Sequence, residues 1–378
     1  MIENLVVGAG VAGCVIANRL AQKNKQVLIV EKRNKIGGQA HDSYNKKNVL
    51  VHDYGPHIFH TDSEEVFKLL SEYTDWILYN HEVLGFIDNN FVPIPFNINS
   101  IAKLFPSEKG NKYIKNLISY FNYGEKITIW DLKNSSNEIL KELAEYIYNK
   151  VFYNYTLKQW DCSPEQLDRE VTSKVPVNIS KDNRYFFDKY QMIPAEGYTT
   201  MFRKMIEMDN ISLLLNTDFK DILSIKNGDF KLYETIRVKN IFYTAPIDYF
   251  FDFEFGKLPY RSLKFKHETY SRKYYQQNAV INYPNNYDFT RVTEFKHITK
   301  QKTPFTTIAK EYPQKCNLED GDIPYYPIPK RDNREIYYKY SAKVKRMKNF
   351  YPVGRLAQYE YLNMTQAIEN ALKTVAKL

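Results

Sequence analysis

Three glycines and one carboxylate near the N-terminus have types and a spacing that carry chemical meaning. Gly8, Gly10 and Gly13 form a GxGxxG loop between the apolar run at residues 2–7 and a helix-like apolar pattern. In this setting Gly8 permits a tight turn, Gly10 lets the backbone approach a pyrophosphate, and Gly13 lets a helix pack on a strand. Glu31 ends the next apolar run, where a carboxylate can accept hydrogen bonds from an adenosine ribose. The pattern therefore predicts a dinucleotide-binding site.

The residues that follow Glu31 favour one class of dinucleotide. In the segment KRNKIGGQ, Gly37 and Gly38 continue the glycine fingerprint as they do in FAD-dependent proteins with two dinucleotide folds, which favours FAD over NAD. Taken alone, the same pair also fits a surface turn. No second GxGxxG motif is present for a nicotinamide cofactor, so we expect electrons from outside, from an NAD(P)H-type or chemical reductant.

The other reactive residue types do not form a familiar catalytic set. No Ser/His/Asp or Cys/His arrangement can be recognised, and Cys14, Cys162 and Cys316 lie far apart without a CxxC pair. The cysteines predict neither a disulfide framework nor a zinc site, so we expect no metal and a reducing compartment. No stretch approaches the roughly 18 apolar residues of a membrane span, and the sequence opens without a basic, apolar leader. We therefore expect a cytoplasmic protein with no membrane span.

Charge and composition narrow the class of ligand. The 378 residues carry 53 Lys plus Arg against 44 Asp plus Glu, a net charge of +9 that is spread along the chain. This balance suits a protein that binds a small anionic substrate. We do not expect nucleic-acid binding, because that is typical of proteins whose basic residues are clustered in one arm. The aromatic content of 15% is high, which indicates that aromatic surface is used.

The chain that positions these residues is longer than a usual single domain. Its patterns predict an α/β fold with a Rossmann-like FAD-binding domain, a helical insert domain and an antiparallel β-sheet domain. Ser63 is expected to cap a helix in which Val66, Leu69, Leu70 and Tyr73 share a face. The predicted boundaries are 1–78, 181–246 and 323–378 for the FAD-binding domain, 79–180 for the helical domain with a mobile substrate lid near 161–180, and 247–322 for the sheet domain.

Four separated motifs resemble one family over essentially the whole chain. They are YGPHIFHTD at 54–62, YTLKQW at 155–160, FTRVTEFKH at 289–297, and PYYPI with VGRLAQYEYLNM between 324 and 364. Together they resemble bacterial UDP-galactopyranose mutases. The resemblance implies a homodimeric FAD-containing isomerase that interconverts the pyranose and furanose rings of a nucleotide-linked galactose for surface polysaccharide. In that family reduced flavin N5 is taken to attack the anomeric carbon and displace the nucleoside diphosphate.

The resemblance also assigns residues to the substrate. It implies that Arg291 and Lys174 clamp the diphosphate from opposite sides, because the planar fork of an arginine can grip two phosphate oxygens. From the residues alone, a surface arginine on a strand is the plainer interpretation of Arg291. Tyr155 matches the residue that stacks on uracil, although a helix end that buries its aromatic residues would look the same. The other implied substrate contacts are Phe152, Thr156, Trp160, Tyr185, Asn282, Tyr326, Tyr361 and His60.

A second set is implied for the flavin. His57 matches a histidine that lies against the flavin and is counted with Arg291 and Lys174 as catalytic. The start of the last helix lies beneath the ring, where a helix N-terminus can stabilise an anionic flavin. Asn363 also suits a purely structural helix cap. The implied cofactor residues are Gly8, Gly10, Val11, Ala12, Gly13, Glu31, Lys32, Gly38, Gln39, His57, Ile58, Gly354, Arg355, Asn363, Met364 and Thr365.

Four positions depart from the usual pattern of the family. Lys174 replaces an arginine, Asn178 stands where arginine is common, Asp161 replaces a glycine, and Asn363 replaces an aspartate. A lysine keeps the charge but loses the bidentate fork, so the grip of the lid on the diphosphate should change. Asp161 is expected to add negative charge beside the substrate entrance. These changes leave the sugar open: UDP-galactose is the first expectation, and UDP-N-acetylgalactosamine, a dTDP-deoxyhexose or a GDP-sugar is the alternative.

Two other classes of protein share the dinucleotide fold. A conventional FAD oxidoreductase of the amine-oxidase type also places a sheet over the flavin, but it needs no diphosphate clamp. A non-catalytic binding protein could keep the fold and lose the cofactor. Arg291, Lys174 and the aromatic platform at Tyr155 argue against the oxidoreductase, whereas loss of the bound flavin on purification would favour the binding protein.

Overall fold

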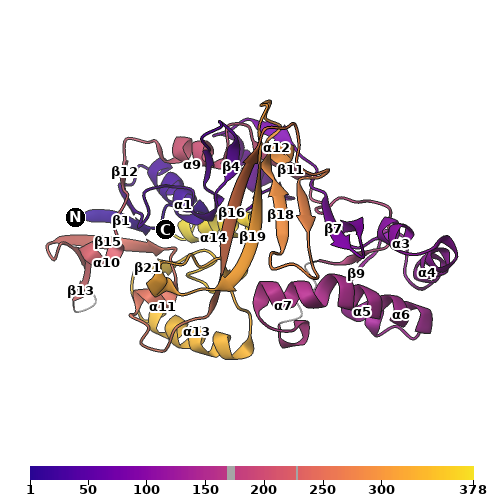
Figure 1. Ribbon diagram of the computed structural model, residues 1–378. Helices are drawn as coiled ribbons and strands as arrows, with labels where there is room; N and C mark the ends of the chain where they lie inside the picture. Colours follow the sequence, from indigo (N-terminus) through magenta and orange to yellow (C-terminus); the bar gives the residue numbers. More distant parts are fainter. Residues whose placement is uncertain (168–174, 227–228) are drawn as a thin grey trace.

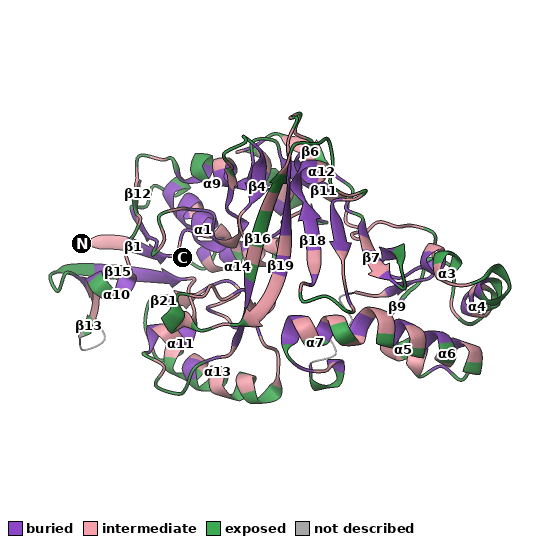
Figure 2. Cartoon of the chain, viewed as in Figure 1, coloured by how far each residue is buried: buried purple, intermediate pink, exposed green. Residues whose placement is uncertain are grey.

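The structure is a computed structural model that describes residues 1–167, 175–226 and 229–378. Figure 1 shows an α/β part that contains both chain termini, a broad antiparallel sheet beside it, and a run of helices on the far side of that sheet. Burial follows this division, because the central strands of the α/β part are largely buried whereas the outer helices expose one face (Figure 2).

A mainly parallel sheet forms the centre of the α/β part. Its strands are β1 (Ile2–Val7), β2 (Val27–Val30), β12 (Ile211–Leu214), β13 (Leu223–Lys226), β14 (Asp229–Leu232), β15 (Ile236–Tyr243) and β21 (Phe350–Pro352). The parallel order is β12-β2-β1-β15; β14 and β21 both pair with β15, and β13 extends β14. Leu5 and Val6 are fully buried, as expected for a parallel strand that is covered on both faces.

Helices cover both faces of this sheet. One hydrophobic core joins it to α1 (Val11–Gln22), α2 (Glu64–Ser71), α9 (Tyr198–Ile206) and α14 (Met364–Val375). A second core contains α10 (Phe219–Ile222), α11 (Ile247–Phe250) and α13 (Arg331–Val344). The predicted start of α2 is confirmed: Ser63 accepts a hydrogen bond from the Val66 N–H, and Val66, Leu69 and Leu70 are buried.

The second core encloses a carboxylate that makes folding stability depend on pH. Burial raises the pKa of Asp248 to about 6; its Oδ2 accepts the Leu258 N–H at 2.8 Å, whereas its Oδ1 has no hydrogen-bond partner among the described residues. Because the folded pKa lies above the unfolded value, this group stabilises the fold fully below about pH 4 and loses that contribution as the pH rises through 6. A difference of about two pH units corresponds to about 3 kcal/mol.

We therefore expect Asp248→Asn to raise the free energy of unfolding by about 1 to 3 kcal/mol at pH 8 and much less at pH 4. Urea unfolding of both proteins at the two pH values measures this. Asp252→Asn is the matched control, because Asp252 is 83% exposed and pairs with Lys220. An equal loss of stability at both pH values would show that the ionisation of Asp248 is not the cause.

The broad antiparallel sheet begins and ends in different parts of the chain. Its strands are β7 (Val83–Ile87), β8 (Asn90–Ile94), β16 (Tyr260–Tyr270), β17 (Val280–Asn282), β18 (Arg291–Glu294), β19 (Thr306–Lys315) and β20 (Tyr326–Pro327). The order is β20-β16-β19-β18-β17-β7-β8, and only β17 and β7 pair in parallel. The hairpin β7–β8, which falls inside the predicted helical range 79–180, thus extends this sheet; the predicted domain boundaries themselves stay predictions.

Smaller elements connect the parts. They are η1 (Gly38–Ala40), β3 (Asp42–Tyr44), β4 (Leu50–His52), β5 (Phe59–Thr61), β6 (Trp76–Leu78), β11 (Tyr190–Pro194), α12 (Phe295–Thr299) and η4 (Leu318–Asp320). The strands form the pair β3–β4 and the three-stranded sheet β5-β11-β6. The sheet brings His60 on β5 opposite Gln191 on β11.

The helical part lies beyond the broad sheet. It comprises α3 (Ile98–Leu104), α4 (Ser107–Tyr120), β9 (Lys126–Ile127), α5 (Ile129–Lys133), α6 (Glu138–Ile147), the π-helix η2 (Tyr148–Tyr153), α7 (Asn154–Trp160), η3 (Pro164–Gln166) and β10 (Val177–Asn178). Leu140, Leu143, Ala144 and Ile147 bury one face of α6, at the spacing of an amphipathic helix. Within the described ranges, no helix has the length and apolar character needed to cross a membrane.

Candidate functional site

A cavity of about 570 Å³ lies where the three parts meet. Its walls come from the loop after β4, the end of α7, strands β17 to β19, and the segment before α14. Most of the implied substrate residues and several implied cofactor residues line it: Gln39, His57, Ile58, His60, Phe152, Tyr155, Thr156, Trp160, Tyr185, Asn282, Arg291, Tyr326, Arg355, Tyr361, Asn363 and Met364.

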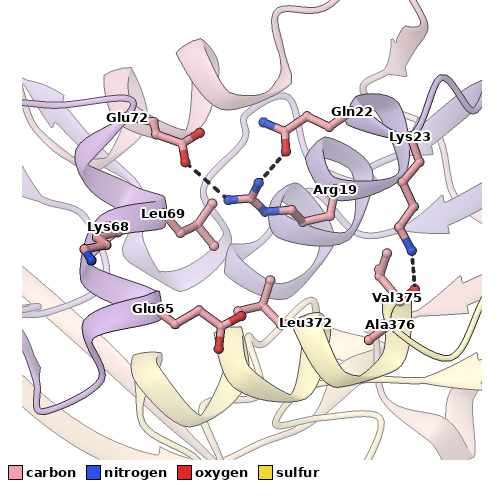
Figure 3. A pocket seen from close by; sticks show the side chains of 10 residues that line it. All are labelled: Arg19, Gln22, Lys23, Glu65, Lys68, Leu69, Glu72, Leu372, Val375 and Ala376. Atoms are coloured by element: carbon pink, nitrogen blue, oxygen red, sulfur yellow. Dashed lines mark hydrogen bonds and ion pairs between the residues drawn. The ribbon is translucent and has the colours of Figure 1, made fainter.

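Another hollow, of about 640 Å³, contains none of the predicted site residues. It lies between α1, α2 and α14 (Figure 3), where Arg19 pairs with Gln22 and Glu72 and the Lys23 Nζ donates to the Val375 carbonyl at 3.0 Å. Because these charged groups already have partners, this hollow offers no evident ligand chemistry.

The π-helix and α7 form one wall of the cavity. Phe152, Tyr155, Thr156, Gln159 and Trp160 recur at intervals of three and four residues, so they share one helical face. A π-turn widens the helix and is frequent at functional sites. The sequence motif YTLKQW thus presents its aromatic and polar residues to the same space.

Arg291 begins β18 and forms the positive centre of the cavity. Its Nη2 donates to the Tyr155 hydroxyl, and its Nε lies 3.5 Å from Glu311 Oε2 but makes no hydrogen bond within the described part of the chain. Burial opposes the charge, yet Glu311 and then Tyr155 hold the pKa of Arg291 well above its ordinary value. The guanidinium is therefore a permanent cation with donor capacity to spare, which suits a phosphate ligand.

Neutral hydroxyl groups surround this cation. Burial raises the pKa of Tyr155, Tyr185 and Tyr326 above the ordinary tyrosine value, so each hydroxyl keeps its proton. Trp160, Tyr326 and Tyr361 form an aromatic cluster with ring centroids 5.3 to 5.8 Å apart. Such a wall can donate hydrogen bonds to an anion and exclude water from it.

Two histidines of the cavity, His57 and His81, are held neutral. Burial lowers the pKa of His57 to about 3, with His52 as the next cause, and burial followed by the charge of Arg291 lowers the pKa of His81 to about 3. The His57 N–H donates to His52 Nδ1 at 3.0 Å. His60 stacks on Phe186 with centroids 3.6 Å apart. Neutral imidazoles can contact a sugar or a flat ring without adding charge.

The predicted glycine loop forms a cradle that fits a dinucleotide. A Cβ on Gly13 would lie 1.9 Å from the Gly8 carbonyl oxygen, so α1 packs against β1 as closely as the backbone allows. A Cβ on Gly10 would lie 3.6 Å from the Gly38 Cα, and no side chain of the described residues caps the first turn of α1, which leaves its N–H groups for a phosphate. Glu31 accepts the Ala9 N–H at 2.9 Å and keeps lone pairs for a ribose.

The C-terminal segment joins this cradle to the cavity. A Cβ added to Gly354 would lie only 3.3 Å from the Cβ of Ala12, so the backbone at Gly354 packs closely against the start of α1. Arg355 donates to Gln39 Oε1 at 3.2 Å and to the Leu362 carbonyl. The remaining implied cofactor residues lie outside the cavity lining: Val11 in the first turn of α1, Lys32 paired with Asp218 at 3.0 Å, and Thr365, whose hydroxyl donates to the His60 carbonyl.

The four departures from the family pattern differ in their surroundings. Lys174 lies outside the described residues. Asn178 is 2% exposed, and neither polar atom of its side chain has a hydrogen-bond partner in the described part of the chain. Asp161 is not part of the cavity lining, and two cations, Arg261 and Lys315, face it at 3.7 Å each. Asn363 caps α14 by accepting the Gln366 N–H at 2.8 Å, and it also lines the cavity.

Several lining residues were not predicted from the sequence: His81, Gln159, Phe186, Glu311, Tyr325 and Gln366. Glu311 pairs in register with Arg291 across β19 and β18. The alternation in the run TTIAKEY indicates a strand, but it does not say which strand is its neighbour. Gln159 and Tyr325 lie inside motifs whose other members were selected, so position within a motif was the available signal.

Comparisons with known proteins match the whole chain. Residues 150–361 match the family model described as UDP-galactopyranose mutase, and residues 6–73 match an NAD(P)-binding Rossmann-like domain. The chain is 35% identical to a UDP-galactopyranose mutase of Mycoplasma genitalium over 99% of this chain and 94% of the relative. It is 32% identical to a dTDP-fucopyranose mutase of Escherichia coli, over 99% and 97%.

Solved structures agree on the fold. A crystal structure of reduced UDP-galactopyranose mutase matches with a TM-score of 0.76 at 14% identity and covers 99% of this chain and 95% of its own. A putrescine oxidase matches with a TM-score of 0.62 at 12% identity, over 99% and 98%. These likenesses, with the Rossmann-like match, confirm the predicted fold class.

Proposed function

Because the chain belongs to the UDP-galactopyranose mutase family, as the sequence motifs predict, we propose that it interconverts UDP-galactopyranose and UDP-galactofuranose with reduced FAD. The observation that carries the proposal is the half-buried cation Arg291, which donates to the hydroxyl of Tyr155 inside a cavity walled by further tyrosines. This arrangement suits a substrate with a flat base and a diphosphate.

The cofactor and the protein have separate tasks in this proposal. When bound, reduced FAD would supply the nucleophile toward the anomeric carbon. Arg291 would hold the departing nucleoside diphosphate close enough for the return step, and Tyr326 and Tyr361 would donate to it and exclude water. His57, in the turn beside Gly55, would lie against the flavin ring as a neutral group. No side chain has to act as nucleophile, in keeping with the lack of a nucleophile–base motif in the sequence.

Substrate identity is the open part of the proposal. The departures at Lys174, Asn178 and Asn363, and the similarity to a dTDP-fucopyranose mutase, favour the same chemistry on another nucleotide sugar as the second candidate. A conventional oxidoreductase is a weaker candidate, because it has no use for a diphosphate-binding arginine in the substrate cavity. We further propose a homodimer that supplies furanose sugar for surface polysaccharide and takes electrons from an external reductant.

The deciding experiment incubates the flavin-loaded protein, reduced with dithionite under anaerobic conditions, with UDP-galactofuranose, and follows UDP-galactopyranose by chromatography. The oxidised protein is assayed in parallel. Conversion by the reduced sample alone is expected. If the protein holds a reducible flavin but converts no UDP-galactofuranose, UDP-galactose is rejected as its substrate. Sugars linked to dTDP or GDP, and N-acetylated sugars, would then be tested in the same assay.

A further inference from the structure

Lys158 of α7 makes an unusual set of contacts outside the cavity. Its Nζ lies within hydrogen-bond distance of four backbone carbonyl oxygens of one loop, those of Tyr283, Asn285, Tyr287 and Phe289, with the last three at 3.2, 3.1 and 3.1 Å, so its three N–H groups are shared among four acceptors. Among the described residues, no carboxylate lies within ion-pair distance of this ammonium. The four carbonyls instead surround it as they would surround a bound cation.

The loop held by Lys158 connects two residues that line the cavity. Residues 283–290 run from Asn282, the last residue of β17, to Arg291, the first residue of β18. Asn282 and Arg291 lie opposite each other in the antiparallel pairing of β17 with β18, so the loop closes a hairpin whose two ends both lie in the cavity wall.

The helix that carries Lys158 is fixed from both sides. Asn154 donates to the Asn285 side chain at 3.0 Å, which adds a second contact between α7 and the loop. From the broad sheet, Arg261 donates to the Gln159 and Lys158 carbonyls at 2.9 and 3.0 Å. The same helix presents Tyr155 to Arg291, one turn before Lys158.

From this arrangement we infer that Lys158 is a positioning residue: its ammonium acts as a built-in cation that locks the 283–290 loop to α7 and thereby holds Arg291 against Tyr155 for nucleotide binding. The side chain does not line the cavity, so it acts through the loop and not on the substrate. The inference rests on the proposed function only in naming a nucleoside diphosphate as the ligand.

The first test needs no substrate. In the flavin-loaded protein, hydrogen–deuterium exchange of a peptide that covers 283–290 should become about tenfold faster in Lys158→Met, which keeps the length of the side chain and removes its charge. Lys150→Met is the matched control, because Lys150 lies on the same helical run but pairs with Asp88 at the surface. Unchanged exchange in Lys158→Met would overturn the inference.

The second test measures UDP binding by calorimetry. Lys158→Met should raise the UDP dissociation constant about tenfold at unchanged flavin content. Lys158→Arg, or methylammonium added to Lys158→Ala, should restore part of the affinity. Equal affinity in Lys158→Met and wild type would overturn the inference, as would rescue by tetramethylammonium, which has no N–H to donate, as effectively as by methylammonium. Failure of the wild-type protein to bind UDP would instead count against the proposed substrate, and the exchange test would still decide the role of Lys158.

Discussion

Replacement of Arg291 by methionine is expected to lower turnover of the nucleotide sugar about a thousandfold while the flavin stays bound. The guanidinium is the half-buried positive charge at the centre of the cavity, and its Nη2 donates to the Tyr155 hydroxyl. Loss of a preorganised charged donor in a water-excluded site commonly costs a factor of 100 to about 1000. Steady-state kinetics and the flavin absorbance of the purified variant measure both quantities.

The effect of Arg291→Met on stability needs a separate control. This substitution leaves the buried carboxylate of Glu311 without its cationic partner, which is expected to destabilise the protein. The double variant Arg291→Met/Glu311→Gln removes both charges and should regain stability without regaining activity. Arg291→Lys keeps the charge but not the fork, so an intermediate loss is expected. Arg331→Ala, at a 90% exposed arginine, should leave activity unchanged. Full activity of Arg291→Met would show that the diphosphate is held elsewhere.

The dinucleotide cradle could be predicted from local sequence patterns, because the interactions that form it join residues close together in the chain. The tight turn at Gly8, the helix start after Gly10 and the close packing at Gly13 are all set within six residues. The capping of α2 by Ser63 is local in the same sense. The cavity residues Arg291 and Tyr155 could be selected only through the resemblance of their motifs, because 136 positions separate two side chains that touch.

The contacts that the sequence did not predict depend on which strands pair and in which register. Glu311 meets Arg291 only because β18 and β19 pair with those two residues opposite one another. The hairpin β7–β8 joins the broad sheet through the parallel pairing of Val83 with Val280, a contact that no local pattern encodes. Asp161 was expected to place negative charge near the substrate, whereas Arg261 and Lys315 face it in the structure.

Alanine substitutions at Gly10 and Gly13 should distinguish an effect on helix packing from an effect on cofactor binding. A Cβ on Gly13 would lie 1.9 Å from the Gly8 oxygen and 3.1 Å from its carbon, and backbone atoms cannot turn aside as a flexible side chain can. Gly13→Ala must therefore push α1 away from β1. We expect the melting temperature to fall by at least about 5 °C and the flavin to be lost on purification.

Gly10→Ala should behave differently, although the two glycines are three residues apart. Its Cβ would meet only the Gly38 Cα at 3.6 Å, an ordinary contact, so the cofactor-free fold should keep its stability. The added methyl group would occupy the space through which a pyrophosphate reaches the backbone, so FAD affinity should fall at least about tenfold. Gly124→Ala, where no atom lies within 4 Å of the new Cβ, controls for backbone strain alone. Normal flavin content in Gly10→Ala would mean that the dinucleotide does not approach the loop at this glycine.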